Sequence, residues 1–225
     1  MRMSAAAGDV DLFIIGAGSG GVRLARMAAQ RGASVAVAED AALGGTCVNV
    51  GCIPKKLYSF AAHYHESFDE AAGFGWSVAD APAFDWETLK ANRRVEIARL
   101  NAVYKQLVEG AGATIVRGRG RVTDSHGVEV AGTRYRAERI VVATGGWPVP
   151  ADIPGGERAI SSNEIFDLAS FPRRLVIVGG GYIACEFASI FNGLGARVTQ
   201  LYRGEQILRG FDLDVRNFVA AEMAK

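Results

Sequence analysis

Two stretches of the chain repeat one pattern of apolar and polar positions. Each has a short apolar run, a glycine-rich turn, an amphipathic segment and a second apolar run; the first extends from Val10 to Glu39 and the second from Leu175 to Leu201. This pattern is typical of a β-α-β nucleotide-binding unit. The repeat therefore predicts an α/β fold with two Rossmann-like dinucleotide-binding units, as an enzyme that passes electrons between two cofactors requires.

The spacing of apolar positions between these units predicts two helices and three short strands. The helices are expected from Lys55 to about Glu70 and from Trp86 to about Glu109, and the strands around residues 114–116, 127–130 and 139–142. A loop containing Trp and Pro, near residues 76–84, is expected between the helices. Residues 145–150, Gly-Gly-Trp-Pro-Val-Pro, are rich in helix and strand breakers and predict a crossing between two domains.

The first glycine-rich turn has the pattern Gly16-x-Gly18-x-x-Gly21. The first glycine allows a tight turn, the second lets the backbone approach a pyrophosphate, and the third lets the helix pack on the strand. Glu39 follows 23 positions after Gly16, where an acid can accept hydrogen bonds from a ribose. The pattern favours a dinucleotide site at the helix N-terminus, and the alternative is a glycine turn with a structural role alone.

The second turn, Gly179-x-Gly181-x-x-Ala184, is the permitted alanine variant of the same pattern. At the position equivalent to Glu39 stands Tyr202, with Arg203 beside it and Arg209 six positions further on. An acid would repel a ribose 2′-phosphate, whereas guanidinium groups bind one with charge-assisted hydrogen bonds. The second unit therefore favours NADPH over NADH, and the alternative is that both arginines are solvated loop charges.

The chain has three cysteines, Cys47, Cys52 and Cys185, and the first two stand five positions apart just before Pro54. Proline suits the first turn of a helix, and the dipole at a helix N-terminus lowers the pKa of a nearby thiol. The thiolate attacks disulfides, so the placement suits a reversible disulfide. A zinc site would need further Cys or His ligands at a recognisable spacing, and the sequence offers none. The spacing alone leaves open the alternative that the two cysteines are an inert pair of small buried residues.

The longer string at residues 44–56, Gly-Gly-Thr-Cys-x-Asn-x-Gly-Cys-x-Pro-Lys-Lys, resembles the redox-active segment of the flavoprotein disulfide reductases. That family includes glutathione reductase, lipoamide dehydrogenase and mercuric reductase. Residues 143–146 and 178–186 resemble its strand-end motif near the flavin and its NADPH turn. The resemblance covers almost the whole chain and implies an FAD-binding domain with the redox-active disulfide in residues 1–150, and the truncated start of an NADPH-binding domain in residues 151–225.

The resemblance also implies roles for single residues. Cys52 would be the thiol beside the flavin, and Cys47 the interchange thiol that attacks the substrate disulfide. Lys55 would lie near the flavin ring and pair with Glu186, and Tyr182 would gate the nicotinamide pocket; the alternatives are a surface lysine, a satisfied helix carboxylate and a packing aromatic. With the two glycine patterns, the further cofactor contacts expected are Gly16, Gly18, Ser19, Gly20, Gly21, Glu39, Thr46, the Gly118–Gly120 turn, Thr144, Gly145, Gly179, Gly180, Gly181, Ile183, Arg203 and Arg209.

The expected substrate is glutathione disulfide. Lipoamide dehydrogenase would be expected to carry an acid where this chain has Tyr202 and Arg203, so the predicted preference for NADPH separates this chain from that branch of the family. Arg26 and Tyr104 correspond, by resemblance, to residues that hold glutathione, and Ser19 completes the expected substrate contacts; Arg26 suits a carboxylate. Arg26 and Tyr104 could equally be residues on the surface of helices. The resemblance favours glutathione disulfide over trypanothione or mercuric ion.

The composition and charge of the chain argue against two classes of partner. Lys and Arg number 25 against 24 Asp and Glu, and the net charge of +1 gives no overall field that would attract nucleic acid or an anionic membrane. The N-terminal residues lack a signal-peptide core, and no apolar run approaches the roughly 20 residues that a membrane-spanning helix needs. We expect a cytoplasmic protein that binds FAD and NADPH and no metal.

The resemblance implies more chain than these 225 residues. Family members are homodimers whose C-terminal domain supplies a His-Glu pair, so we expect a fragment with little turnover by itself. A catalytically incomplete FAD-binding or regulatory module is the alternative from another class. A monooxygenase with two dinucleotide units would explain the glycine turns, but it would leave the cysteine string without a purpose.

Overall fold

The computed structural model describes residues 8–77 and 82–225, and the chain divides into two compact units. Unit 1 comprises residues 1–54 and 94–163, and unit 2 comprises residues 55–93 and 164–225. The division falls inside two long helices, α3 (Cys52–Glu70) and α4 (Trp86–Glu109). Residues 78–81 of the loop expected near 76–84 lie outside the described residues. The domain boundary expected after residue 150 stays a prediction.

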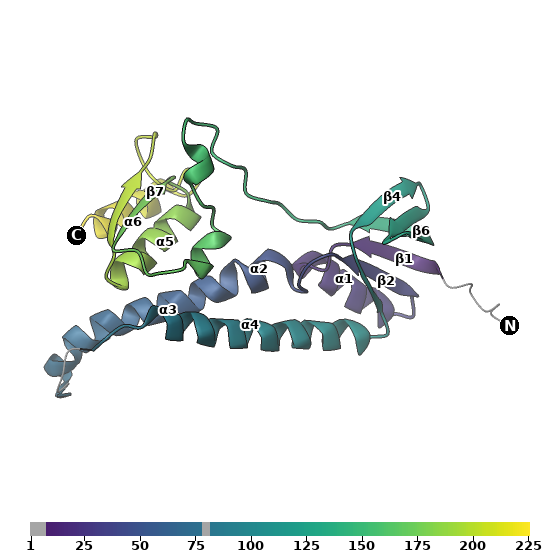
Figure 1. Cartoon of the computed structure of the whole chain (residues 1–225), viewed down its shortest axis with the longest axis horizontal. Helices are drawn as coiled ribbons and strands as arrows, with labels where there is room; N and C mark the ends of the chain where they lie inside the picture. The colour runs from purple at the N-terminus through teal and green to yellow at the C-terminus, as the bar shows by residue number, and fades with distance from the viewer. Residues whose placement is uncertain (1–7, 78–81) are drawn as a thin grey trace. The chain divides into compact units, whose positions relative to one another are not determined.

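Unit 1 is built on a six-stranded mixed sheet with the order β3-β2-β1-β6-β5-β4 (Figure 1). The strands β1 (Asp9–Ile15), β2 (Val35–Glu39), β3 (Thr114–Arg117) and β6 (Thr133–Val142) pair in parallel. Strand β5 (Gly127–Val130) pairs antiparallel with β6, and β4 (Gly120–Asp124) pairs antiparallel with β5. Helix α1 (Ser19–Ala29) connects β1 to β2. This β-α-β arrangement confirms the first Rossmann-like unit.

The core of unit 1 lies on both faces of the sheet because side chains alternate along the central strand β1. Ile14 packs in one cluster with Val22 of α1 and Val108 of α4. Its neighbours Phe13 and Ile15 pack in a second cluster on the opposite face. A strand buried on both faces reads as a continuous apolar run, which explains why the sequence marks β1 so clearly.

The elements that the sequence missed are short, exposed or dependent on distant partners. Strand β4 is mostly exposed, and helix α2 (Gly45–Asn49) has only five residues. Strand β6 begins six residues before the predicted strand, because its first half pairs with β5 while its second half pairs with β1. The 3-10 turns η1 (Ala71–Phe74), η2 (Gly156–Arg158) and η3 (Glu164–Asp167) were also not predicted.

Unit 2 contains the second β-α-β arrangement. Strands β7 (Arg174–Val178) and β8 (Arg197–Leu201) pair in parallel, and helix α5 (Tyr182–Gly193) connects them. Helix α6 (Leu213–Met223), which the sequence analysis did not predict, follows and is capped by the side chain of Asp212. The second Rossmann-like unit is therefore confirmed as far as this pair of strands.

An aromatic cluster fills the centre of unit 2. The Tyr58 ring contacts the rings of Trp86 and Phe166, and Phe166 in turn contacts Phe187 of α5. The Tyr58 hydroxyl also donates to the Phe166 carbonyl oxygen at 2.8 Å. The cluster fixes α5 against the parts of α3 and α4 that belong to this unit.

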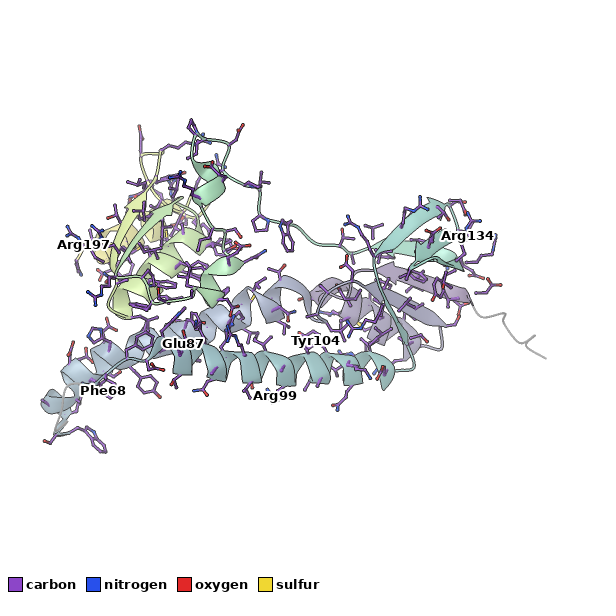
Figure 2. All side chains as sticks on the ribbon, in the orientation of Figure 1. Phe68, Glu87, Arg99, Tyr104, Arg134 and Arg197 are labelled. Atoms are coloured by element: carbon purple, nitrogen blue, oxygen red, sulfur yellow. The ribbon has the colours of Figure 1, made fainter. Side chains whose placement is uncertain are left out.

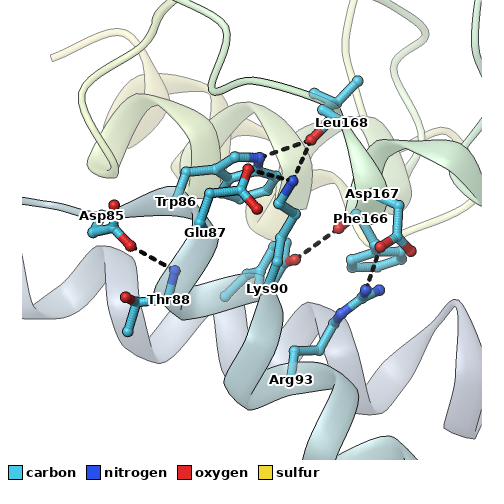
Figure 3. Close-up of polar contacts among 10 residues, drawn as sticks. Asp85, Trp86, Glu87, Thr88, Lys90, Arg93, Phe166, Asp167 and Leu168 are labelled. Atoms are coloured by element: carbon cyan, nitrogen blue, oxygen red, sulfur yellow. Dashed lines mark hydrogen bonds and ion pairs between the residues drawn. The ribbon is translucent and has the colours of Figure 1, made fainter.

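Two buried cations of α4 complete this packing (Figure 3). Lys90 donates to the Leu168 carbonyl oxygen at 2.8 Å and pairs with Glu87 at 2.7 Å. Arg93 pairs with Asp167 at 2.6 Å. Because a buried charge needs such partners, these contacts tie α4 to residues 166–168.

Among the described residues, no helix is long and apolar enough to cross a membrane.

Candidate functional site

Three motifs predicted from the sequence meet at the carboxyl ends of the parallel strands of unit 1. Gly16 follows β1, Glu39 ends β2, and Thr144 follows β6. Gly16 has a φ of 104°, and a methyl group on it would collide with the Ala143 carbonyl oxygen. The Gly118 N–H donates to the Glu39 carbonyl oxygen at 2.9 Å, which brings in the turn at 118–120, although Gly120 already belongs to β4. This edge is where open α/β sheets bind ligands.

The first glycine turn separates glycines that the fold needs from one that it does not. A methyl group on Gly21 would collide with the Gly16 carbonyl oxygen, as the tight turn requires. A methyl group on Gly18 would make an ordinary contact of 3.8 Å with the Gly45 Cα atom. No side chain of the described residues caps α1, whose first residues Ser19 and Gly20 are exposed. The turn therefore offers backbone N–H groups and open space, which fit a pyrophosphate.

The Glu39 carboxylate is held by the backbone around this turn. Its Oε2 accepts from the Ala17 N–H at 2.8 Å, and its Oε1 accepts from the Ala41 N–H at 2.9 Å. Each carboxylate oxygen can accept more than one hydrogen bond. Glu39 is thus oriented and still able to accept from ribose hydroxyls.

The cysteine segment is built directly onto the first glycine turn. Gly44 forms a parallel bridge with Gly18, and its N–H donates to the Ala17 carbonyl oxygen at 2.9 Å. Gly45 has a φ of 61°, and a methyl group on it would lie 2.8 Å from the Gly18 Cα atom. The glycine pair before Cys47 is therefore required by this close approach.

The thiols lie at two successive helices. Cys47 is half-buried within α2, whose fold exposes the neighbouring Thr46, and Cys52 is the exposed first residue of α3. The sequence predicts both thiols before a single helix, whereas in the structure Cys47 lies in the additional short helix α2. Pro54 lies in the first turn of α3, as predicted.

Two asparagine side chains hold the segment that carries Cys47. The Asn49 amide donates to the carbonyl oxygens of Leu43 at 3.1 Å and Gly45 at 2.9 Å. Asn101 of α4 donates to the Leu43 carbonyl oxygen at 2.8 Å and to the Asn49 Oδ1 at 3.0 Å. Sequence reasoning missed Asn101, since only its polar side chain within a helical pattern distinguishes it.

The predicted substrate residues belong to unit 1. Ser19 begins α1, and Arg26 lies in its last turn, where the buried Arg26 Nε atom has no hydrogen-bond partner among the described residues. Tyr104 lies on α4 and packs against the cluster around Ile14 (Figure 2). Arg26 thus retains donor capacity that none of the described residues uses.

The second glycine turn lies at the carboxyl end of β7 in unit 2. The Gly179 N–H donates to the Leu201 carbonyl oxygen at 2.8 Å, and α5 begins after Gly181 without a side-chain cap. A methyl group on Gly181 would meet no atom within 4 Å. Tyr182 and Ile183 are exposed at the start of α5, as are Arg203 and Arg209 after β8. The exposed surface of this turn fits a second pyrophosphate.

An ion pair joins two of the predicted catalytic residues in unit 2. The Lys55 Nζ lies 2.6 Å from the Glu186 Oε1, and their side chains remain 26% and 38% exposed. Both line a pocket of about 720 Å³ together with Tyr182. The structure therefore brings together, within one unit, the expected pair of Lys55 and Glu186 and the Tyr182 side chain that was expected to gate a nicotinamide pocket.

Comparison with known proteins agrees with these observations. The profile of the family described as pyridine nucleotide-disulphide oxidoreductase matches residues 10–225. The chain is 51% identical to glutathione reductase of Burkholderia cepacia and 45% identical to glutathione reductase of Nostoc sp., in each case over 96% of this chain and 48% and 47% of the relative. It is 48% identical to the chloroplastic/mitochondrial glutathione reductase of Pisum sativum, over 91% of this chain and 39% of the relative.

The chain thus spans about half the length of the curated relatives that it matches, or less. The family match, in contrast, covers both glycine turns and the cysteine segment between them. The chain belongs to the pyridine nucleotide-disulphide oxidoreductase family.

Proposed function

We propose that this chain carries the FAD-binding and redox-disulfide part, and the start of the NADPH-binding domain, of a reductase that acts on glutathione disulfide. The relatives at 45–51% identity are named glutathione reductase, which supports this substrate. The observation that carries the proposal is the contact of Gly44 and Gly45 with Gly18, since it attaches the cysteine segment to a dinucleotide-binding turn.

The residues of unit 1 fit FAD. The open space at Gly18 and the uncapped start of α1 suit its pyrophosphate, and the oriented carboxylate of Glu39 suits its adenosine ribose. FAD bound there would supply the chemistry of hydride acceptance from NADPH and of two-electron transfer to a disulfide. Thr46, the 118–120 turn, Thr144 and Gly145 are the further contacts that we assign to it.

The two thiols perform the exchange with substrate in this proposal. In the reduced pair, the Cys47 thiolate attacks one sulfur of glutathione disulfide, forms a mixed disulfide and releases one glutathione thiolate. The Cys52 thiolate then attacks the Cys47 sulfur, which releases the second glutathione and restores the Cys47–Cys52 disulfide. One NADPH, one proton and one glutathione disulfide thereby yield NADP⁺ and two glutathione molecules.

Lys55, Glu186 and Tyr182 form the proposed nicotinamide pocket. The carboxylate of Glu186 holds the Lys55 ammonium in place at 2.6 Å. Tyr182 lies at the start of α5, 56% exposed, where its ring can cover the pocket that it lines. Arg203 and Arg209 would select NADPH by binding its 2′-phosphate.

The proposed substrate contacts are Ser19, Arg26 and Tyr104. A buried guanidinium nitrogen without a partner favours an anionic ligand, and the carboxylates of glutathione supply one. Arg26→Gln should therefore raise KM for glutathione disulfide more than it lowers kcat. We assign this binding to the complete protein.

Turnover of NADPH with glutathione disulfide by the full-length protein tests the proposal. We expect Cys47→Ser and Cys52→Ser each to reduce turnover to background, because each removes one thiolate of the exchange. Cys185→Ala, which replaces a buried cysteine of α5, is the matched control and should retain most of the turnover. Retained activity in either serine variant, or faster turnover with another disulfide or mercuric ion, would contradict the proposal.

A further inference from the structure

The segment that follows β8 folds back onto the second glycine turn and is fixed there at both ends. Tyr202 lies against Gly180, where a methyl group would stand 2.5 Å from the Tyr202 ring. Six residues later, the Leu208 N–H donates to the Gly180 carbonyl oxygen at 2.6 Å. Leu208 is only 6% exposed and takes up a left-handed φ of 57°, which a leucine adopts only under tertiary constraint.

The two arginines proposed to bind the 2′-phosphate directly follow these two anchors. Arg203 comes immediately after Tyr202, and Arg209 comes immediately after Leu208. Both are exposed. Their separation in space therefore depends on the conformation of residues 204–207, which connect the anchors.

Arg216 of α6 holds the end of this connection that precedes Leu208. Its Nε donates to the Ile207 carbonyl oxygen at 2.8 Å, and its Nη2 donates to the Gln206 carbonyl oxygen at 2.7 Å. The neighbouring Asn217 strengthens the link, because its Oδ1 accepts from the Gln206 side chain at 3.0 Å. A planar guanidinium can bind two successive carbonyl groups in this way, whereas the ammonium group of lysine lacks that fixed fork.

We propose that Arg216 is a positioning residue for NADPH selectivity: it fixes residues 206 and 207 so that Arg203 and Arg209 stand ready for one phosphate. This inference rests on the proposed use of NADPH. The structural reason is preorganisation, since a segment already held in its binding conformation loses less entropy when the ligand binds. Arg216 itself is committed to the two carbonyl groups and acts through the other arginines.

Steady-state kinetics of the full-length protein with NADPH and with NADH tests the role of Arg216. We expect Arg216→Gln to raise KM for NADPH by about tenfold, the effect of losing charge-assisted hydrogen bonds, while kcat and KM for NADH change by less than about twofold. Arg216→Lys should resemble Arg216→Gln, because it keeps the charge and loses the fork. Arg197→Gln on β8, an exposed residue of the same unit, controls for the loss of one positive charge (Figure 2).

The other outcomes would contradict either the positioning role of Arg216 or the 2′-phosphate site itself. Equal increases of KM for NADPH and NADH would show a general structural role, and normal kinetics in Arg216→Lys would show that charge alone matters. If Arg216→Gln does not fold, Arg216→Lys is judged by the same limits. The double variant Arg203→Gln/Arg209→Gln separates the two proposals: unchanged KM for NADPH there would refute the 2′-phosphate site itself, whereas a raised KM there with normal Arg216 variants would refute the positioning role alone.

Discussion

At the scale of single residues, side chains of the candidate site are oriented by the backbone before any ligand is considered. Glu39 accepts from two N–H groups, Asn49 and Asn101 donate to the segment that carries Cys47, and Arg216 donates to two carbonyl groups. Such contacts reduce the number of conformations that a binding group must lose. Substitutions at these positions should therefore affect binding more than overall stability.

Glu39→Gln should raise the dissociation constant of FAD by about tenfold, because an amide nitrogen cannot accept a hydrogen bond from the backbone or from a ribose. FAD binding followed by flavin fluorescence measures this change. The exposed neighbour Asp40→Asn is the matched control for charge and should bind FAD normally. Equal affinities of the Glu39→Gln variant and the unchanged protein would contradict the assigned ribose contact.

Tyr58→Phe should lower the free energy of unfolding by about 1–2 kcal/mol, because the buried Phe166 carbonyl oxygen loses the hydroxyl that donates to it. Urea denaturation measures the effect. Tyr64→Phe, on the same helix and 63% exposed, should change stability by less than about 0.5 kcal/mol. Similar losses in both variants would mean that the hydroxyl of Tyr58 has no special role.

At the scale of elements, the first strand-turn-helix has glycines with different purposes. Gly16 and Gly21 are required by backbone contacts within the turn. Gly18 meets no such limit, and we propose that its small size serves the approach of a ligand. The shared spacing of these glycines in the sequence does not reveal this division.

Gly21→Ala should lower the free energy of unfolding by about 3 kcal/mol, because its methyl group collides with backbone. Gly18→Ala should change stability by less than about 0.5 kcal/mol and still weaken FAD binding by at least about tenfold. Thermal unfolding and FAD titration of both variants measure these effects. Normal FAD affinity in Gly18→Ala would contradict the assignment of the FAD pyrophosphate to this turn.

The stability of the protein should depend on pH through Asp85, which directly precedes α4. Hydrogen bonds from the side chain and the backbone N–H of Thr88 lower the pKa of Asp85. A carboxylate with a lowered folded-state pKa stabilises the protein above its unfolded-state pKa, about 3.9, and this contribution is lost as the pH falls through the folded-state value. Above about pH 5, Asp85→Asn should therefore be less stable than the unchanged protein in urea, and the difference should shrink as the pH falls below the unfolded-state pKa.

Asp69→Asn on α3, an exposed position, controls for the loss of one negative charge in the Asp85 experiment. A stability difference for Asp85→Asn that stays constant from pH 6 to pH 3 would show that the charge of Asp85 does not stabilise the helix.

At the scale of the whole molecule, the two compact units each contain a glycine turn at the carboxyl end of parallel strands. A ligand that binds only the folded unit stabilises it by about 2.7 kcal/mol at a concentration 100 times its dissociation constant. Two ligands with separate sites should therefore protect separate segments.

Hydrogen exchange measures this protection in the full-length protein. FAD should slow exchange in β1, β2 and α1, and NADP⁺ should slow exchange in β7, β8 and the start of α5. Arg203→Gln should weaken only the second effect. Protection of the β7 and β8 region by FAD alone, with none from NADP⁺, would contradict the assignment of the two turns.

The strands and helices next to the glycine turns could be predicted because their signals are local. Strands β1 and β7 are apolar runs that end at a turn, and α4 was predicted with both of its observed bounds. Strand β4 and the first half of β6 could not, because β4 is mostly exposed and the two are ordered by pairing with β5. The same limit applies to α2, which is too short to form without its surroundings.

The sequence by itself determined the two β-α-β units, the family and the residue types of the candidate site, because periodicity, turn glycines and motif strings are properties of neighbouring residues. Only the tertiary structure decided that Gly44 and Gly45 lie against Gly18, that Asn101 reaches Leu43 across 58 positions, and that Arg216 holds the segment between two arginines. These contacts join residues distant in sequence or within a loop of irregular conformation. Their geometry depends on the packing inside each unit, which no local pattern encodes.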